Sequence, residues 1–168
     1  ILDQEIFYSG EQNFYEDQVI KSVESLKVGS SYSLRELMRR SVVYSDNTAA
    51  QLLFNYYPEG FLDRIMEALG IQLYKPTGEK EDFITARLYA NVFRILYNAS
   101  YLTKEYSDEA LSILTKTNYK NGAVAKLPTD TLVAHKFAER TDINMVTGDV
   151  FQRQLHECGI VYAKNYEE

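Results

Sequence analysis

The sequence of 168 residues contains no tryptophan, one cysteine and three prolines, and it has no long run of apolar residues. A single cysteine, Cys158, excludes an internal disulfide and any metal site built from several cysteines. Between Glu157 and Gly159 it is typical of a small apolar filler. No apolar run reaches the roughly 18 residues that a membrane-spanning helix needs, so we expect no transmembrane segment.

Positive charge is also in short supply, since 18 basic residues stand against 24 acidic ones and the formal net charge is −6. A nucleic-acid-binding domain usually carries a basic stripe, and none is present, so nucleic acid is not an expected partner. Hydrophobic residues make up 45% of the chain, which is typical of a globular core and excludes global disorder. The length predicts a single domain, 1–168, or part of one. Because the chain starts Ile1-Leu2-Asp3 without a methionine, we expect a piece of a longer protein.

Helix signals dominate the first two thirds of the chain. Ser33 with Glu36 three residues later forms a capping box, and apolar residues follow at helical spacing. Gly70 has the position of a left-handed helix end. Proline, glycine and cap residues bound the other predicted helices, which are 47–57, 61–69 and 86–98, with weaker signals for 14–26 and for a helix capped by Ser107.

The last third changes character after Gly122. Residues 131–137 and 155–162 are β-prone, and turn residues lie between them. We therefore predict an α+β fold (mixed α/β), mostly helical over 33–126, with two antiparallel sheet strands within 131–162. Because two strands leave an open edge along 155–162, we also predict self-association through that edge.

Two short stretches combine residue types that carry chemistry. Ser45, Asp46 and Asn47 stand between two predicted helices, where helix capping alone explains such residues. Lys136 follows His135 on an apolar strand, where a lone lysine also serves as a gatekeeper against aggregation. Taken separately, each stretch has a purely structural explanation.

Taken together and in this order, the two stretches resemble the penicillin-recognising serine hydrolases, above all the class A β-lactamases and their D-Ala-D-Ala peptidase relatives. That family carries three motifs, Ser-x-x-Lys, Ser-Asp-Asn and Lys-Thr-Gly. The second stands at 45–47, followed by Thr-Ala-Ala, and the similarity covers roughly residues 32–162. The resemblance implies the helical region of a β-lactamase or DD-peptidase with part of its antiparallel sheet, incomplete at both ends.

The resemblance also implies roles for particular residues. A serine attacks a β-lactam or a D-Ala-D-Ala-like acyl amide, Ser45 relays a proton to the leaving nitrogen, and Lys136 supplies positive charge. Asn47 binds the amide of the substrate, Asp46 braces the turn, and the backbone N–H of Glu139 is one oxyanion donor. We expect the Ser45 hydroxyl and the Lys136 ammonium to face each other across one crevice. No cofactor or metal is implied, and the expected location is outside the cytoplasmic membrane.

The sequence departs from the family at three places. It contains no Ser-x-x-Lys, so the resemblance places the nucleophile upstream of residue 1. Phe137 and Ala138 replace threonine and glycine of the third motif, which removes a hydroxyl donor and adds a methyl group on the strand. The expected deacylating glutamate is also missing, since the loop over 71–83 has no Glu-x-x-x-Asn and offers only Glu79 and Glu81, which are typical surface charges.

These departures leave more than one function open. The leading hypothesis is a serine hydrolase that resembles a peptidase, an esterase or a penicillin-binding relative more than an efficient lactamase. The alternative is a catalytically decayed binding or scaffold module for cell-wall peptides. A third reading is a plain helical interaction domain, in which both stretches are only caps and gatekeepers.

Overall fold

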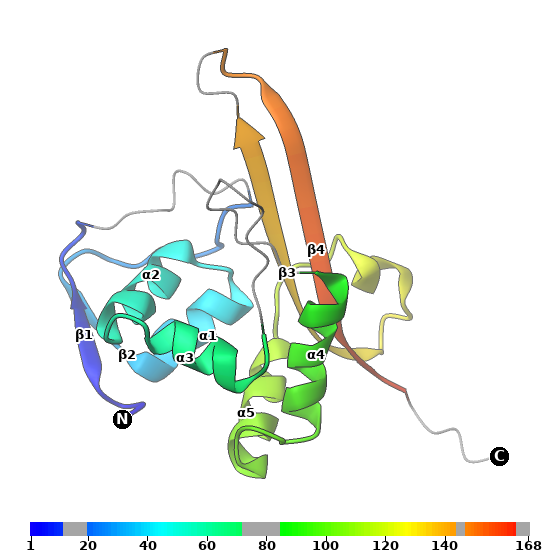
Figure 1. Cartoon of the computed structure of the whole chain (residues 1–168). Helices are drawn as coiled ribbons and strands as arrows, with labels where there is room; N and C mark the ends of the chain where they lie inside the picture. Colours follow the sequence, from blue (N-terminus) through cyan, green and yellow to red (C-terminus); the bar gives the residue numbers. More distant parts are fainter. Residues whose placement is uncertain (12–19, 72–84, 144–146, 164–168) are drawn as a thin grey trace.

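The computed structural model describes residues 1–11, 20–71, 85–143 and 147–163. Its elements, in chain order, are β1 (Glu5–Tyr8), β2 (Ser30–Ser33), α1 (Leu34–Val43), α2 (Asn47–Tyr56), α3 (Phe61–Ala68), α4 (Ala86–Tyr97), α5 (Lys104–Leu114), the 3-10 helix η1 (Ala123–Lys126), β3 (Leu132–Ile143) and β4 (Val150–Tyr162). Figure 1 shows α1–α3 with β1 and β2 on one side, the α4–α5 pair beside them, and a long β3–β4 hairpin whose tip extends past the helices. The expected mixture of helices and antiparallel strands is confirmed.

Helix α1 connects two separate hydrophobic clusters. The first lies between β1, β2, α1 and α2 and includes the fully buried Leu37. The second lies between α4, α5 and one face of the β3–β4 hairpin, and Val42 near the end of α1 packs against it. Cys158 packs there as well, as expected of an apolar filler. The C-terminal end of α1 therefore stands where the two clusters meet.

Most of the helix starts and ends that were predicted from local sequence signals are confirmed. The Ser33 hydroxyl accepts the backbone N–H of Glu36 at 3.2 Å, which caps α1. Gly70 has a φ of +65° directly after α3, in the left-handed region that glycine enters without steric cost. Helices α2, α3 and α4 each end one residue before the predicted boundary, which is the usual uncertainty of helix ends.

Other expectations are wrong. Helix α5 begins at Lys104 because the Thr103 hydroxyl accepts the N–H of Tyr106, so Thr103 and not Ser107 is the cap. Ser107 is buried inside that helix. Of the predicted helix 14–26, residues 20–26 are irregular, and 14–19 lie outside the described residues.

The antiparallel pair β1–β2 was not predicted at all. Each strand has only four residues and is flanked by polar residues, so neither carries a clear alternating pattern. The residues of β1 and β2 are extended because the two strands pair with each other and because Tyr8 packs on α1 and α2. This is a tertiary effect that a local pattern does not contain.

The β3–β4 hairpin is longer than the sequence predicts. Both strands continue into 138–143 and 150–154, because cross-strand pairing overrides the weak local propensity of these polar residues. In the ladder Lys136 stands opposite Cys158, and His135 stands opposite Gly159. Among the described strands, β4 pairs only with β3, and self-association through its other edge stays a prediction.

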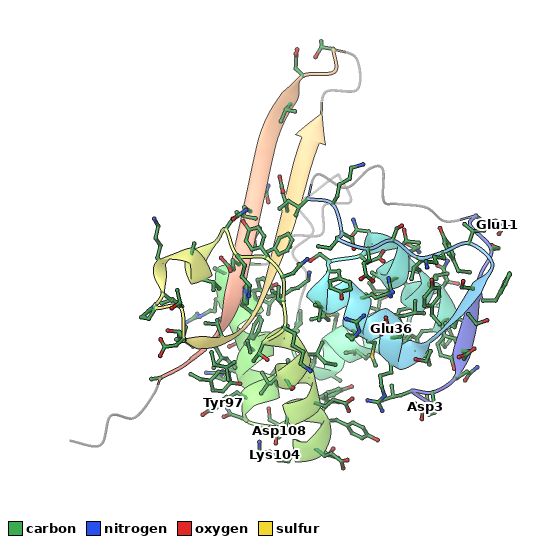
Figure 2. All side chains as sticks on the ribbon, turned by 180° about the vertical axis from the view of Figure 1, so that it is seen from behind. Asp3, Glu11, Glu36, Tyr97, Lys104 and Asp108 are labelled. Carbon is green, nitrogen blue, oxygen red and sulfur yellow. The ribbon has the colours of Figure 1, made fainter. Side chains whose placement is uncertain are left out.

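The outer ends of the helical part are polar. Seen from behind in Figure 2, Tyr97, Lys104 and Asp108 lie together at the end of the α4–α5 pair, where Lys104 and Asp108 form an ion pair. Such exposed pairs contribute little to stability. No helix among the described residues is long and apolar enough to cross a membrane.

Candidate active site

The turn between α1 and α2 presents Ser45. The Arg40 carbonyl oxygen accepts the backbone N–H of Tyr44 at 3.0 Å and that of Asp46 at 3.3 Å, so both neighbours of Ser45 are tied to the end of α1. Ser45 itself has a φ of +54°, which is left-handed and costs a residue with a side chain about 1–2 kcal/mol. Strained backbone of this kind concentrates at functional sites.

Asp46 fixes the same turn from inside. Its side chain is almost fully buried, and Oδ1 accepts the backbone N–H of Ala49 at 3.0 Å, which caps α2. Burial raises the pKa of the Asp46 carboxyl, although the N–H groups of Ala49 and Thr48 and the charge of Arg40 act in the opposite direction. The expected role of Asp46 as a brace of the turn agrees with this geometry.

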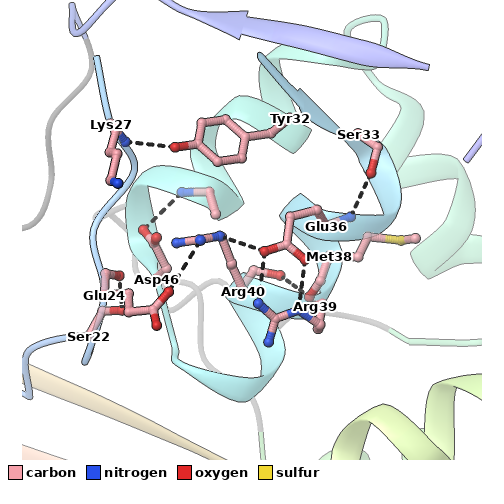
Figure 3. Close-up of polar contacts among 12 residues, drawn as sticks. Ser22, Glu24, Lys27, Tyr32, Ser33, Glu36, Met38, Arg39, Arg40 and Asp46 are labelled. Carbon is pink, nitrogen blue, oxygen red and sulfur yellow. Dashed lines mark hydrogen bonds and ion pairs between the residues drawn. The ribbon is translucent and has the colours of Figure 1, made fainter. Parts of the chain in front are cut away.

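A charged cluster around Arg40 of α1 lies next to the turn. Figure 3 shows Arg40 reaching Glu36 on its own helix and Glu24 from the preceding loop. The Nε of Arg40 is 2.8 Å from Glu36, its Nη2 is 3.3 Å from Glu24, and its guanidinium lies over the ring of Tyr32. Because three partners hold the side chain of Arg40, its backbone carbonyl is a rigid anchor for the turn.

Lys136 approaches the turn from the sheet. Its Nζ donates a hydrogen bond to the Ser45 hydroxyl, so the predicted meeting of these two groups is confirmed. Burial lowers the pKa of Lys136 from 10.5 to about 8. The Tyr89 hydroxyl on α4 donates to the Lys136 carbonyl oxygen at 2.8 Å and so fixes the backbone from which the lysine extends.

The segment after α5 brings turn and strand together. The Asn118 N–H donates to the Val43 carbonyl oxygen at the end of α1, at 3.0 Å. The buried Thr117 hydroxyl donates to the His135 carbonyl oxygen on β3 at 2.8 Å, and the Tyr119 ring stacks on Phe137 with centroids 4.0 Å apart. Three successive residues therefore join the end of α1 to β3, and sequence reasoning missed all of them because no local pattern marks such contacts.

On the other face of β3 from the lysine, His135 pairs with a carboxylate. Its Nδ1 is 2.8 Å from Glu157 on β4, and the second oxygen of Glu157 accepts the N–H of Ala123 at 2.5 Å. Burial lowers the pKa of His135, and the neighbouring Glu157 only partly offsets this effect. The pair ties η1 to the hairpin and so stabilises the strand that carries Lys136.

An apolar cavity of about 340 Å³ opens beside Lys136. It lies between α1, α4, α5 and β3, with Met38, Val42, Phe93, Leu96 and Ile113 among its walls. The cavity is partly open to solvent, so the apolar side chains of three helices are left without a packing partner on that side. Within the described ranges, no group of three His, Cys, Asp or Glu side chains is arranged to hold a metal ion.

The other predicted site residues are placed as follows. Asn47 begins α2 and is exposed, Glu139 lies half-buried in β3 opposite Leu155, and Ala138 is exposed beside it. Phe137 is buried and turned onto Tyr119. Glu79 and Glu81, the carboxylates considered for deacylation, lie outside the described residues.

The model of a family described as the β-lactamase enzyme family matches residues 2–168. The chain belongs to this β-lactamase enzyme family. Solved structures agree on the fold: a β-lactamase from Chitinophaga pinensis has 21% identity and a TM-score of 0.72, over 95% of this chain and 62% of that one. A β-lactamase from Xanthomonas campestris has 20% identity and a TM-score of 0.71, over 99% and 62%.

A third solved structure is a mutant of PBP-A as an acyl-enzyme complex with penicillin G, with 16% identity and a TM-score of 0.67, over 95% of this chain and 63% of that one. At identities this low the likeness shows the fold alone. The chain spans about 62% of the length of the β-lactamase structures above. No curated protein matches the sequence.

Within this β-lactamase fold, Asp46 gives a direct test of the turn. Asp46→Ala loses the cap of α2 and is expected to lower the free energy of unfolding by about 1 kcal/mol, whereas Asp46→Asn keeps an acceptor oxygen and loses less. Because the pKa of Asp46 is raised in the folded state, the native chain binds more protons than the unfolded chain. The native chain should therefore gain stability as the pH falls from 7 through the folded pKa of Asp46 toward 3.8.

Urea denaturation of the three proteins at several pH values measures both effects. Asp46→Asn should lack the part of the pH dependence that Asp46 contributes. Parallel pH profiles for the native chain and Asp46→Asn would contradict a buried carboxylate in the turn.

Proposed function

We propose that this chain is part of a serine hydrolase of the β-lactamase type, which acts on β-lactams or D-Ala-D-Ala-like acyl amides through an acyl-enzyme. The observation that carries the proposal is the hydrogen bond from the Lys136 ammonium to the Ser45 hydroxyl at a strained, rigidly held turn. A lysine and a serine from segments far apart in sequence, joined in a half-buried site, are an arrangement suited to proton transfer. Capping and gatekeeping do not require such a contact.

The nucleophilic serine comes, in this proposal, from a helix outside these 168 residues. The apolar cavity beside Lys136 supports this idea, because a helix with apolar side chains fills it and restores normal packing. Such a helix starts next to Lys136 and Ser45. A Ser-x-x-Lys at that end brings the attacking hydroxyl to the substrate carbonyl.

Ser45 then acts as the proton relay of the reaction. As the serine of the motif attacks the acyl carbon, its proton passes to a base, and the amide C–N bond breaks. Ser45 gives its own proton to the leaving nitrogen and is reprotonated from that base. The nearby charge of Lys136 makes it easier for the Ser45 oxygen to carry partial negative charge meanwhile.

Substrate recognition rests on the charge of Lys136 and on polar groups around it. With a pKa of about 8, Lys136 is mostly protonated at neutral pH and attracts a substrate carboxylate. Asn47 at the exposed start of α2 and the backbone N–H of Glu139 on β3 complete the proposed set, as contacts to the amide and to the oxyanion. We place the reaction outside the cytoplasmic membrane, where cell-wall peptides are found.

Labelling with a fluorescent penicillin tests the proposal. A longer protein that includes this chain and the missing motif should form a covalent band on a denaturing gel, and the 168-residue chain alone should not. Ser45→Ala should slow labelling by about 10²-fold, the scale of one general acid, while exposed Phe7→Leu should have no effect. No band from the longer protein at any dose contradicts the proposal, and a band from the 168-residue chain contradicts an external nucleophile.

A second candidate is a non-catalytic module that binds cell-wall peptides. The buried and stacked Phe137 favours it, because this side chain occupies the motif position whose hydroxyl contacts the substrate in the family. Reversible binding of peptidoglycan fragments to the longer protein, without covalent labelling or turnover, would select this candidate.

A further inference from the structure

Phe137 is the least expected residue of the site, because the family has threonine at this position and a phenyl ring cannot hydrogen-bond. Its ring is buried, stacks on Tyr119, and lies 4.8 Å from the Lys136 Nζ, measured to the ring centroid. The same Nζ donates to the Ser45 hydroxyl. The ammonium is therefore held between a hydroxyl oxygen and the face of an aromatic ring.

We propose that Phe137, fixed by Tyr119, is a positioning residue that holds the Lys136 side chain against Ser45 and keeps it charged. A lysine side chain has four rotatable bonds and loses considerable entropy when it is held in one place. The negative face of an aromatic ring attracts an ammonium within about 6 Å of its centroid, and the attraction grows when water is excluded. The ring thus anchors the ammonium through its face rather than through a hydrogen bond.

Tyr119 makes this anchor rigid. It follows Asn118, whose N–H is bound to the Val43 carbonyl oxygen at the end of α1, so the stacked ring sits on the same segment that fixes the Ser45 turn. The segment with Asn118 and Tyr119 therefore positions both Ser45 and the Phe137 ring relative to Lys136. This inference deepens the proposed function, but its geometry does not depend on any substrate.

The other groups around the lysine act differently on its charge. Tyr89 from α4 binds only the backbone carbonyl of Lys136, Cys158 stands opposite in β4, and His135 is the neighbour on β3. Burial is the effect that lowers the pKa of Lys136 to about 8. Ring attraction opposes burial, so weakening the attraction while the space of the ring stays filled lowers the pKa of Lys136 further.

The test is an NMR titration of the Lys136 side chain in the 168-residue protein, followed through its ¹³Cε and ¹⁵Nζ shifts and assigned by their loss in Lys136→Met. Phe137→Leu should lower the pKa of Lys136 by about 0.5–1 unit, and Phe137→Tyr should leave it at about 8. The control is Phe61→Leu at the start of α3, which removes the ring of another stacked pair, with Tyr57 at 4.3 Å.

If Phe137→Leu fails to fold, trifluorinated phenylalanine at position 137 replaces it, since fluorine weakens the negative ring face and keeps the shape of the ring. This variant should lower the pKa of Lys136 by about half a unit. An unchanged pKa in a folded variant, or an equal fall in Phe61→Leu, overturns the proposal. Because the titration uses no substrate, its failure is separate from a failure of penicillin labelling.

Discussion

Lys136→Met is expected to slow covalent labelling of the longer protein strongly and at the same time to stabilise the fold. The variant removes the ammonium that donates a hydrogen bond to Ser45, and loss of one preorganised charge of this kind costs about 10²–10³-fold in rate. Methionine fills nearly the same space with an unbranched apolar chain, so packing against Phe137 is largely kept. The measurement is the rate of band formation with fluorescent penicillin.

The gain in stability follows from the lowered pKa of Lys136. The folded chain releases this proton near pH 8 and the unfolded chain near 10.5, so a buried charge opposes folding at neutral pH. Each pKa unit corresponds to 1.36 kcal/mol, so after loss of the hydrogen bond to Ser45 we expect a net gain of about 1–3 kcal/mol. The stabilisation by Lys136→Met should be full below pH 8 and should disappear as the pH rises to 10.5.

Urea denaturation between pH 7 and 10.5 checks this pH dependence. Exposed Lys104→Met, on α5, is the control, because its partner Asp108 is also at the surface and such a pair contributes little. If Lys136→Met is less stable than the native chain at pH 7, the buried charge of Lys136 does not destabilise the fold.

Gly159→Val is expected to cause the largest loss of stability of any single change in the hairpin. A Cβ at Gly159 would lie 2.5 Å from the Ala134 carbonyl oxygen and 2.7 Å from the His135 Cβ, closer than side chains approach in real proteins. The first of these atoms belongs to the backbone, so the strands themselves must separate. Overpacking of this kind costs about 3 kcal/mol or more in the free energy of unfolding.

The change should reach the site as well, because His135 and Lys136 are neighbours on the strand that would move. We expect a lower urea midpoint together with shifted NMR signals from Lys136 and Ser45. Leu155→Ala, at an exposed position of the same strand, should change stability by less than about 0.5 kcal/mol and leave those signals in place. A small effect at Gly159 would mean that the ladder is not packed as described.

The sequence predicts the helices that have strong local signals. The cap at Ser33 and the left-handed end at Gly70 are short-range features, and their hydrogen bonds and dihedral angles follow from residues within one turn. Where two neighbouring residues can both cap a helix, the prediction of its start fails. Thr103 and Ser107 are both good cap residues, and only the packing of α5 decides which of them starts the helix.

The candidate site divides in the same way. The residues Ser45, Asp46 and Lys136 are recognisable in the sequence because their types and order resemble a known motif set. Their partners are not, since Tyr119 and Thr117 contact β3 through folding of the chain after α5, and neither stands in a recognisable pattern. In the sequence, Phe137 only indicates that the threonine hydroxyl of the family is lost. In the structure its ring lies next to the ammonium of Lys136.

The sequence alone thus determined the family resemblance, the positions of most helices, and the identity of the serine and lysine, because these depend on residue types and on contacts within one helical turn. Only the tertiary structure decided that the lysine is half-buried, bound to Ser45 and placed over an aromatic ring. The surroundings of Lys136 come from α1, α4 and α5 together, and no stretch of sequence contains that information by itself.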